Sequence, residues 1–428
     1  MTEQEIAGLG PAFATYLGRY RSCFLQKRTA AHFDNYCRGL LSDLPRKTVE
    51  PIALEAGTAV RTLQEFLTTT RWDQQHMRDL LQRQLADAIA EMPTDTLGTV
   101  GILDETSCRK WGDETPGVQR QYLGCVGKVD NGIVTVHVGV AKGRFQALLD
   151  ADLYLPKAWD ADRERCRTAG IPDDIRYRPK WRIALDQLIR LDGNGIRFDW
   201  LVFDEGYGAA VPLLRALNLV GQRFVAEVPV NFAVADVKDG ATRRADQRLR
   251  ASEAKRGKRY RLTHRTVQDS VWRACTAKVW VAGREQLLIV AINEATAEVK
   301  YFLSNALSSP VAQLLAVAFC RWNVEHSFRV AKQEAGLMHY EGRDYTGLIR
   351  HLMLALVVLG FVATQTERLR GEKSACECGA GVPGVKPALR GVVASSSSGS
   401  GKAASERGHC LSPAAKRASD EVPQETAA

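Results

Sequence analysis

The longest continuous pattern of apolar and charged positions lies between Ser309 and Gly336, and it predicts a single helix. Ser309 is suited to cap this helix, Pro310 to its first position and Gly336 to its end. The first half is apolar on almost every face, so we expect it to be buried. The second half carries residues three or four apart that share one face: Arg321, Glu325, Phe328, Arg329 and Lys332. This stripe fits either a solvated, salt-bridged surface or a carboxylate held between cations at a site.

Two short apolar runs in the first half of the chain resemble each other, and both predict buried strands. One run is expected to end at Asp104 and the other at Asp204, where a carboxylate can meet a ligand at the edge of a sheet. If Asp104, Asp204 and Glu325 converge, they need a cation, because two charges 4 Å apart repel by about 4 kcal/mol at an effective dielectric constant of 20. Magnesium is suited to this role, since it prefers carboxylates, water and phosphate oxygens.

The segment 96–230 alternates between strand and helix patterns and therefore predicts an α/β unit. The tripeptide Asp130-Asn131-Gly132 separates two β-rich runs and predicts the turn of a hairpin. The remaining patterns indicate strands over 122–129, 133–140, 149–155 and 224–228, an irregular stretch over 156–179, and helices over 181–191 and 211–219.

Residues 1–95 show helical spacing and are expected to form a DNA-binding region. Within them, the segment 49–67 has the pattern of a helix, a turn at Gly57 and a second helix. This unit is either a helix-turn-helix, whose Arg61 could reach DNA, or part of a plain helical bundle.

The segment 231–308 interrupts the α/β order and is expected to be a basic, β-rich insertion. Its residues Arg256, Lys258 and Arg259 are expected to contact DNA phosphates, the alternative being a solvated loop. From residue 371 to 428 the chain is rich in Ala, Gly and Ser, a composition typical of disorder.

The overall composition narrows the choice of partners. The formal net charge of +9 favours a polyanion such as DNA. The ten cysteines form no repeating framework, so we expect reduced thiols in the cytoplasm. The start of the chain lacks the pattern of a signal peptide, and the most apolar run, 352–363, is shorter than the roughly 20 residues that cross a bilayer. We therefore expect no membrane partner and a buried core helix over 352–363.

The trio Asp104, Asp204 and Glu325 resembles the Asp-Asp-Glu (DDE) signature of insertion-sequence transposases with an RNase H-like catalytic domain. The predicted helix resembles the signature Tyr-x-x-Arg-x-x-x-Glu-x-x-x-x-x-x-Lys of one large branch of these enzymes. Arg321, Glu325 and Lys332 fall on its Arg, Glu and Lys. The order of three antiparallel strands, helix, strand, helix and strand also matches the RNase H-like order.

Two further phrases, at 203–208 and 336–343, are similar to the insertion sequence seven-hundred-and-one group. The resemblance extends over about residues 10–368. The chain departs from the signature at Ala318, which stands where the family has Tyr.

The resemblance implies an α/β fold with an RNase H-like catalytic domain over 96–230 and 309–370. It implies that Asp104, Asp204 and Glu325 hold two Mg²⁺ ions, which Mn²⁺ could replace, and catalyse DNA cleavage and strand transfer. Arg321 and Lys332 are then expected to bind DNA phosphates. The partners are transposon ends and target DNA, bound by a homodimer that acts in the cytoplasm on nucleoid DNA. Two alternatives stay open: a DNA-binding protein derived from a transposase that no longer cuts, and a hydrolytic nuclease of the same fold.

Overall fold

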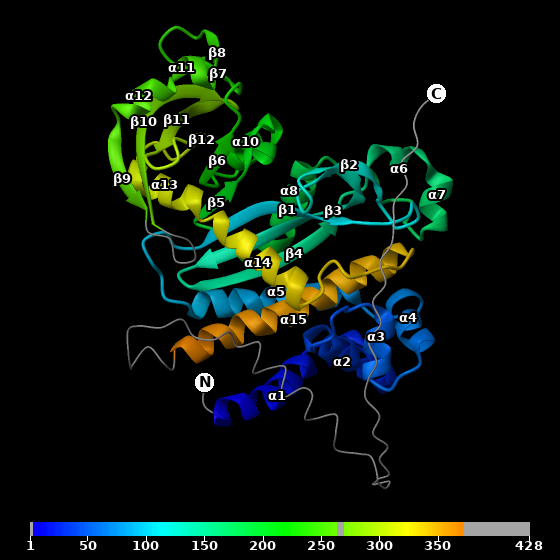
Figure 1. Ribbon diagram of the computed structural model, residues 1–428. Coiled ribbons are helices and arrows are strands. Elements are labelled where there is room, and N and C mark those ends of the chain that lie inside the picture. The colour runs from blue at the N-terminus through cyan, green and yellow to red at the C-terminus, as the bar shows by residue number, and fades with distance from the viewer. Residues whose placement is uncertain (1–2, 263–268, 372–428) are drawn as a thin grey trace, which may run out of the picture.

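The computed structural model describes residues 3–262 and 269–371, arranged as a helical base, a central α/β layer and a β-rich upper part (Figure 1). The helices are α1 (Glu3–Gly18), η1 (Arg21–Cys23), α2 (Lys27–Leu41), α3 (Val49–Glu55), α4 (Val60–Thr68), α5 (Gln74–Glu91), α6 (Lys157–Ala161), α7 (Arg163–Thr168), α8 (Lys180–Gly193), α9 (Glu205–Gly208), α10 (Val211–Leu219), α11 (Ala245–Arg248), α12 (Ala251–Lys255), α13 (Val311–Phe319), α14 (Trp322–Glu334) and α15 (Tyr345–Gly371). The strands are β1 (Val100–Arg109), β2 (Gln119–Leu123), β3 (Lys128–Lys142), β4 (Phe145–Leu153), β5 (Trp200–Phe203), β6 (Phe224–Val228), β7 (Ala233–Asp236), β8 (Thr242–Arg244), β9 (Lys258–Leu262), β10 (Ser270–Val281), β11 (Arg284–Asn293) and β12 (Val299–Ser304).

All the described strands belong to one sheet, in the order β2-β3-β1-β5-β6-β12-β11-β10-β7-β8, with β4 paired to β3 and β9 paired to β10. In its core, β4, β3 and β1 are antiparallel, whereas β1, β5 and β6 are parallel. This confirms the expected RNase H-like order. The basic insertion continues the same sheet, because β12 pairs antiparallel with β6.

The two faces of the core sheet carry different helices. Successive residues of a strand point to opposite faces, and on β1 Asp104 contacts Arg321, just before α14, whereas Glu105 contacts Lys180 of α8. Helix α14 packs against β1, β3 and β4, and α13 packs against β5 and β6. The face that carries Asp104 is therefore the face covered by α13 and α14.

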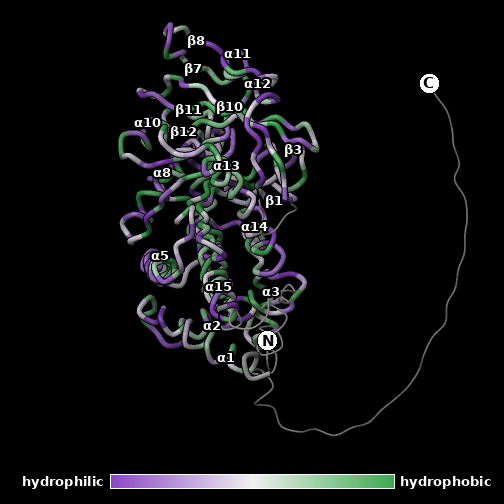
Figure 2. The backbone as a smooth tube through the Cα atoms, turned by 90° about the vertical axis from the view of Figure 1, so that its left-hand side faces the viewer, coloured by the Kyte–Doolittle hydropathy of each residue, from purple (hydrophilic) through white to green (hydrophobic). Residues whose placement is uncertain are grey.

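The helical base is joined to the core by α15, which packs against α2, α4, α5 and β4. The side view places α13, α14 and α15 one after another through the middle of the molecule (Figure 2). The expected apolar helix is much longer than 352–363: it extends over Tyr345–Gly371, long and apolar enough to span a bilayer by length and composition alone. Because 89% of its apolar stretch is buried inside the protein, α15 is a core helix of this fold.

The expected hairpin turn at Asp130-Asn131-Gly132 is wrong, because these residues lie inside β3. The chain turns instead over 124–127, where the amides of Val126 and Gly127 donate to the carbonyl of Leu123. A Cβ on Gly132 would lie 2.3 Å from the carbonyl oxygen of Cys108 on β1. This glycine therefore permits close strand pairing and does not mark a turn.

Other expectations for the flanking segments fared differently. The helical region before residue 95 is confirmed, including the pair α3 and α4 with a turn at Gly57, where φ is +59°. The stretch 156–179 is not wholly irregular, because it contains α6 and α7, and Asp162 caps α7 by accepting from the amide of Arg165. Most of the expected disordered segment, 372–428, lies outside the described residues.

His351 on α15 ties the base to the end of α14, and its burial predicts acid sensitivity. Its Nδ1 accepts from the hydroxyl of Tyr36 at 2.8 Å, and its Nε2 donates to the carbonyl of Gly336 at 2.8 Å. Burial lowers the pKa of His351 to about 4. Between pH 6.5 and 4 the unfolded chain therefore binds a proton that the folded chain does not, so the free energy of unfolding falls as the pH drops.

We expect this one group to remove about 2 kcal/mol of stability between pH 7 and pH 5. Urea unfolding at the two pH values should show a smaller loss for His351→Gln than for the wild type, although the variant is less stable at pH 7. His76→Gln on α5 is the control and should keep the wild-type pH dependence. An unchanged pH dependence in His351→Gln would contradict the prediction.

Candidate active site

Asp104 and Asp204 are brought side by side by the pairing of β1 with β5. The parallel ladder joins Val100–Leu103 to Trp200–Phe203, with Leu103 opposite Phe203. Asp104 and Asp204 are the next residue on each chain, and neighbouring strands lie about 4.8 Å apart. The expectation that β1 ends at Asp104 is wrong, because β1 continues to Arg109 in its pairing with β3. The pairing with β5 ends at Leu103, one residue before Asp104.

Asp204 is fixed by the turn that follows β5. Its Oδ1 accepts hydrogen bonds from the amides of Gly206 at 3.0 Å and Tyr207 at 3.3 Å, so it caps the short helix α9. A Cβ on Gly208 would lie 1.9 Å from the carbonyl oxygen of Glu227, so only glycine lets α9 pack this closely on β6. Asp204 thus keeps its other oxygen available at the sheet edge.

Arg321 connects the third carboxylate to this pair. Its Nη1 lies 3.3 Å from Oδ2 of Asp104 and 3.6 Å from Oε1 of Glu325. The side chains of Arg321 and Asp104 are 17% and 11% exposed, whereas that of Glu325 is 61% exposed. The structure therefore brings Asp104, Asp204 and Glu325 to one site, with a guanidinium among them.

The expected single helix is broken at this point. Between α13 and α14, the amides of Cys320, Arg321 and Val324 donate three residues back along the chain, at 3.0, 3.5 and 3.0 Å. Such tight turns within a helical run often mark strain or a hinge. The end at Gly336 is confirmed, with φ of +60° and the amide of Leu337 bonded to the carbonyl of Ala331.

The expected stripe on α14 is split between the sheet and the solvent. Phe328 is buried with its ring 5.0 Å from that of His137 on β3, and Arg329 is exposed. Lys332 is half-buried near Asp104 and Cys108, and burial lowers its pKa. Arg321, Phe328 and Lys332 therefore face the sheet, as a site helix requires.

The electrostatics of the site favour an additional cation. Burial raises the pKa of Asp104 to about 7, the Arg321 guanidinium opposes that shift, and the neighbouring Asp204 adds to it. Although burial lowers the pKa of Arg321, the carboxylates of Asp104, Asp204, Glu227 and Glu325 around it raise the pKa overall. One guanidinium does not fully compensate the buried negative charge.

The donor set fits magnesium by chemistry, since it consists of carboxylate oxygens at a sheet edge. Across residues 3–262 and 269–371, however, no three acidic, His or Cys side chains already surround one point at metal-binding distances. The guanidinium of Arg321 lies between two of the three carboxylates. Binding a metal here therefore requires Arg321 to leave Asp104 and Glu325.

Of the expected DNA-binding residues of the insertion, Arg256 directly follows α12, and Lys258 and Arg259 are the first residues of β9. Arg259 is ion-paired with Glu294 at 2.9 Å. Most other arginines between residues 243 and 261 are also ion-paired: Arg243 with Asp239, Arg244 with Asp246, Arg248 with Asp236 and Arg261 with Asp269. Arg256 and Lys258 are exposed and form no ion pair with any part of the chain that the structure describes.

His137 belongs to the site but was not found from the sequence. It is the β3 partner of Asp104, is fully buried, and its Nε2 lies 2.7 Å from Oγ1 of Thr135. Its Nδ1 has no hydrogen-bond partner within the described residues, and burial lowers the pKa to about 3. No local signal marks it, because its position depends on the register of β1 and β3.

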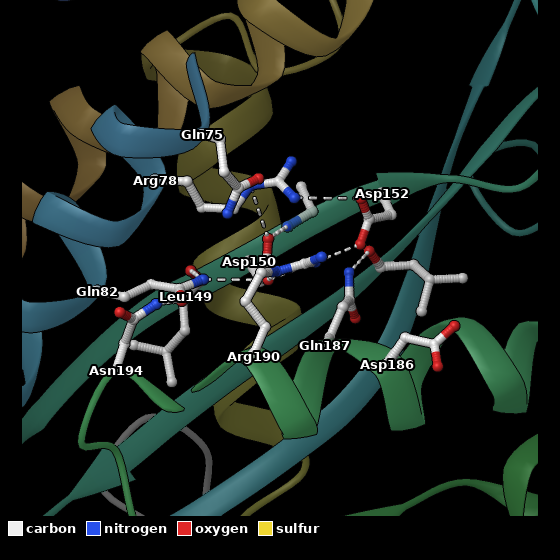
Figure 3. Close-up of polar contacts among 12 residues, drawn as sticks. Gln75, Arg78, Gln82, Leu149, Asp150, Asp152, Asp186, Gln187, Arg190 and Asn194 are labelled. Carbon is white, nitrogen blue, oxygen red and sulfur yellow. Dashed lines mark hydrogen bonds and ion pairs between the residues drawn. The ribbon is translucent and has the colours of Figure 1, made fainter. Parts of the chain in front are cut away.

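A second buried polar cluster, also missed from the sequence, joins α5, β4 and α8 (Figure 3). Asp150 and Asp152 of β4 accept from Arg190 at 2.7 and 2.6 Å, and both lie 3.6 Å from Arg78. Gln82 donates to Asp150 at 3.0 Å. Two carboxylates matched by two guanidinium groups leave no excess charge for a metal, so this cluster fastens the helical base to the core.

A family model and a curated relative match large parts of this chain. A family model described as "DDE superfamily endonuclease" matches residues 19–287, a range that includes Asp104 and Asp204 and ends before Glu325. The "Probable transposase for insertion sequence element IS701" of Microchaete diplosiphon is 34% identical over 210 residues, which is 48% of this chain and 51% of that protein. The chain thus matches about half the length of this curated relative.

Among solved structures, the NurA nuclease from Sulfolobus solfataricus is similar over 58% of this chain and 81% of its own. With 8% identity and a TM-score of 0.25, this likeness bears on neither fold nor function.

Proposed function

The chain belongs to the DDE superfamily of endonucleases. We propose that it is the transposase of an insertion sequence, which uses magnesium to cleave DNA strands and to join them to a target. The observation that carries this proposal is the grouping of Asp104, Asp204 and Glu325 around Arg321. The similarity to an insertion-sequence transposase supports the same substrate.

In this proposal the three carboxylates provide the oxygens that hold the metal ions. Two bound Mg²⁺ ions would supply Lewis-acid chemistry and an activated oxygen nucleophile for in-line displacement at phosphorus. In cleavage, water attacks the phosphorus and the bond to the 3′ oxygen breaks, leaving a 3′-hydroxyl. In strand transfer, that 3′-hydroxyl attacks a phosphodiester of the target, and a target 3′ oxygen leaves.

The two cations of the site take on complementary tasks. Arg321, once displaced from Asp104 and Glu325, presents a planar fork that can bind a DNA phosphate in bidentate fashion. Lys332 adds a single positive charge on the same face of α14. Both cations hold the scissile strand against the carboxylates. Their main contribution is therefore to orient the substrate, and less to transfer protons.

One assay tests this function directly. The protein is incubated with Mg²⁺ and a linear DNA that carries the sequences flanking its gene on both sides. We expect nicked or excised ends and products joined to a second DNA. Cut products without joined ones would favour a hydrolytic nuclease. Binding without any cutting, in Mg²⁺ or Mn²⁺, would favour a DNA-binding regulator that has lost catalysis. The cause would then be sought first in Arg321, which pairs with two of the carboxylates, and in Ala318, which departs from the family signature.

The partners and location follow as part of the same proposal. Two copies of the chain are proposed to act on the DNA ends in the cytoplasm, associated with the nucleoid. Light scattering of the protein with and without end DNA measures the number of copies, and a complex that contains one copy would overturn this part.

The exposed cations of the insertion are proposed to bind DNA without sequence preference, and we predict that two of them dominate. Replacing Arg256 and Lys258 by Ala should reduce the steepness of the slope of log affinity against log salt concentration by about 2, since each phosphate contact contributes roughly 0.9 to that slope. Fluorescence anisotropy with a random duplex over a range of salt concentrations measures the slope. Adding Arg259→Ala should change it less, because Arg259 is paired with Glu294.

Arg243 and Arg244 provide a matched control for this prediction, because both are already ion-paired with aspartates. Their double replacement by Ala should leave the slope close to that of the wild type. Equal slopes for the wild type and the variant lacking Arg256 and Lys258 would mean that these two side chains are only solvated.

A further inference from the structure

A buried hydroxyl group without a partner lies next to the carboxylates of the candidate active site. Tyr207 of α9 is 2% exposed, and its backbone amide donates to Oδ1 of Asp204 at 3.3 Å. Its phenolic oxygen is also buried, yet it has no hydrogen-bond partner in the part of the chain that the structure describes. Buried polar groups are almost always hydrogen-bonded, so this exception requires an explanation.

The charges around Tyr207 identify the acceptors near its hydroxyl. Burial raises the pKa of Tyr207 well above its ordinary value. Three neighbouring carboxylates raise the same pKa further, those of Glu105, Asp104 and Asp204. The phenol therefore stays neutral at physiological pH and can donate its proton to a hydrogen bond. Three acceptors thus surround a donor that none of them uses in this arrangement.

The present contacts of the three carboxylates show which one can take up this donor. Glu105 lies on the opposite face of β1 from Asp104 and is held by Lys180 at 2.6 Å. Asp204 accepts from two amides of α9. Asp104 accepts from the amide of Glu105 at 2.7 Å, and its Oδ2 lies 3.3 Å from Arg321. Of the three, Asp104 is the carboxylate that loses a side-chain contact when Arg321 makes way for a metal.

The displacement of Arg321 matches the spare hydroxyl of Tyr207. It leaves Asp104 without a side-chain donor, and Tyr207 is a donor without an acceptor. A neutral phenol can fix the orientation of a carboxylate without cancelling its negative charge, as a guanidinium does. The carboxylate then keeps its full charge for a metal ion. Hydrogen bonds of this kind orient metal-binding carboxylates and strengthen metal binding.

We infer that Tyr207 is a positioning residue, which donates a hydrogen bond to Asp104 when Arg321 leaves this carboxylate. The inference rests on the proposed function and deepens it, because it assigns the group that orients Asp104 in the loaded site. Tyr207 and Asp104 are both largely buried, so the bond forms within the protein and not at its surface.

The first test needs neither metal nor DNA. Urea unfolding of the protein in EDTA at pH 8 compares Tyr207→Phe in the wild type and in Arg321→Gln. In the wild type, this substitution should leave the unfolding equilibrium constant unchanged or lower it, because the lost hydroxyl had no partner. In Arg321→Gln the hydroxyl should already bond to Asp104. There, Tyr207→Phe should raise the unfolding equilibrium constant at least about 10-fold, as expected for a hydrogen bond to a charged group.

The second test measures metal binding directly. Electron paramagnetic resonance of Mn²⁺ should show that Tyr207→Phe weakens Mn²⁺ binding by about 10-fold, as is typical when a hydrogen bond to a metal ligand is removed. Cleavage at low Mn²⁺ should fall to a similar extent and should recover at saturating Mn²⁺. Affinity for DNA in EDTA should stay within about 2-fold. A merely structural role for Tyr207 would change stability and leave the Mn²⁺ affinity of the folded protein unchanged.

Tyr301→Phe is the matched control, because the hydroxyl of this buried tyrosine donates to the carbonyl of Leu249 at 3.1 Å. It should raise the unfolding equilibrium constant equally in the wild type and in Arg321→Gln, and leave Mn²⁺ binding unchanged. Adding Asp104→Ala to Arg321→Gln removes the acceptor and should make Tyr207→Phe neutral again.

The inference is overturned if Tyr207→Phe affects unfolding equally in the wild type and in Arg321→Gln, or if its cost persists with Asp104→Ala. Unchanged Mn²⁺ binding in Tyr207→Phe would also overturn it. If the wild type cuts DNA but these differences are missing, only this inference fails. If the differences are found but the wild type never cuts DNA, the contact with Asp104 stands and the proposed function fails.

Discussion

Glu325→Gln is expected to lower magnesium-dependent DNA cleavage by at least about 100-fold, a loss typical of removing one preorganised group that stabilises charge in an active site. The substitution preserves the size and helix propensity of the side chain but removes the negative charge that we propose helps to bind a metal ion. Glu325 is 61% exposed, so α14 should still form. Affinity for DNA should stay within about 2-fold, as for most surface substitutions. Cleavage of labelled DNA and a gel-shift titration measure both properties on one preparation.

Glu334→Gln is the matched control, because Glu334 is the last residue of the same helix. Nine residues separate it from Glu325, which is about 13 Å along the helix axis. It should cut at a rate close to that of the wild type. If Glu334→Gln abolishes cleavage and Glu325→Gln does not, the third carboxylate of the site has been assigned to the wrong residue.

Elements with strong local signals could be predicted from the sequence to the residue. Helix α10, expected over 211–219, and strand β6, expected over 224–228, have the expected bounds. Each combines a clear hydrophobic period with flanking Gly, Pro or polar residues, and short-range effects decide such cases. The end of α14 at Gly336 was predictable for the same reason.

Features that depend on distant contacts could not be predicted in this way. The break between α13 and α14 coincides with Phe319, whose ring lies 4.7 Å from that of Trp272 on β10, and with Arg321, which reaches Asp104. No local residue signals a break there. Likewise, the tripeptide at 130–132 has the composition of a turn, but its contacts to β1 keep it in the strand.

The candidate site was partly predictable, and the reason lies in strand register. A sequence can suggest that an apolar strand is followed by an Asp, and this located Asp104 and Asp204. It cannot give the partner across the sheet, so His137 escaped notice. It also cannot foresee that Arg321, which shares a helix face with Glu325 and was expected to bind phosphate, reaches Asp104 on β1 as well.

The pairing of Arg321 leads to a second prediction of large effect, on stability and not on cleavage. Without metal, Arg321 is the cation that offsets the buried carboxylate of Asp104. Arg321→Gln should therefore lower the free energy of unfolding in EDTA at pH 8 by about 3 kcal/mol, because one partner of a buried pair is left alone. The loss should be smaller at pH 6, where Asp104, whose pKa is already about 7, is protonated in the folded state.

Magnesium should reverse this loss, and that reversal distinguishes a counter-ion from a merely structural arginine. The raised pKa of Asp104 fixes the direction of the pH dependence. The stability that protonation of Asp104 provides is present at low pH and is lost as the pH rises through about 7. A bound cation replaces the missing guanidinium, so Mg²⁺ should stabilise Arg321→Gln more than it stabilises the wild type. Urea unfolding with EDTA or Mg²⁺ measures both differences.

Arg182→Gln is the control. It removes an Arg from an i, i+4 pair with Asp186 on the more exposed surface of α8 and should be close to neutral. In an Asp104→Asn background the cost of Arg321→Gln should largely disappear, as a double-mutant cycle requires for a direct pair. If Mg²⁺ stabilises the wild type and Arg321→Gln equally, Arg321 does not occupy the place of the metal.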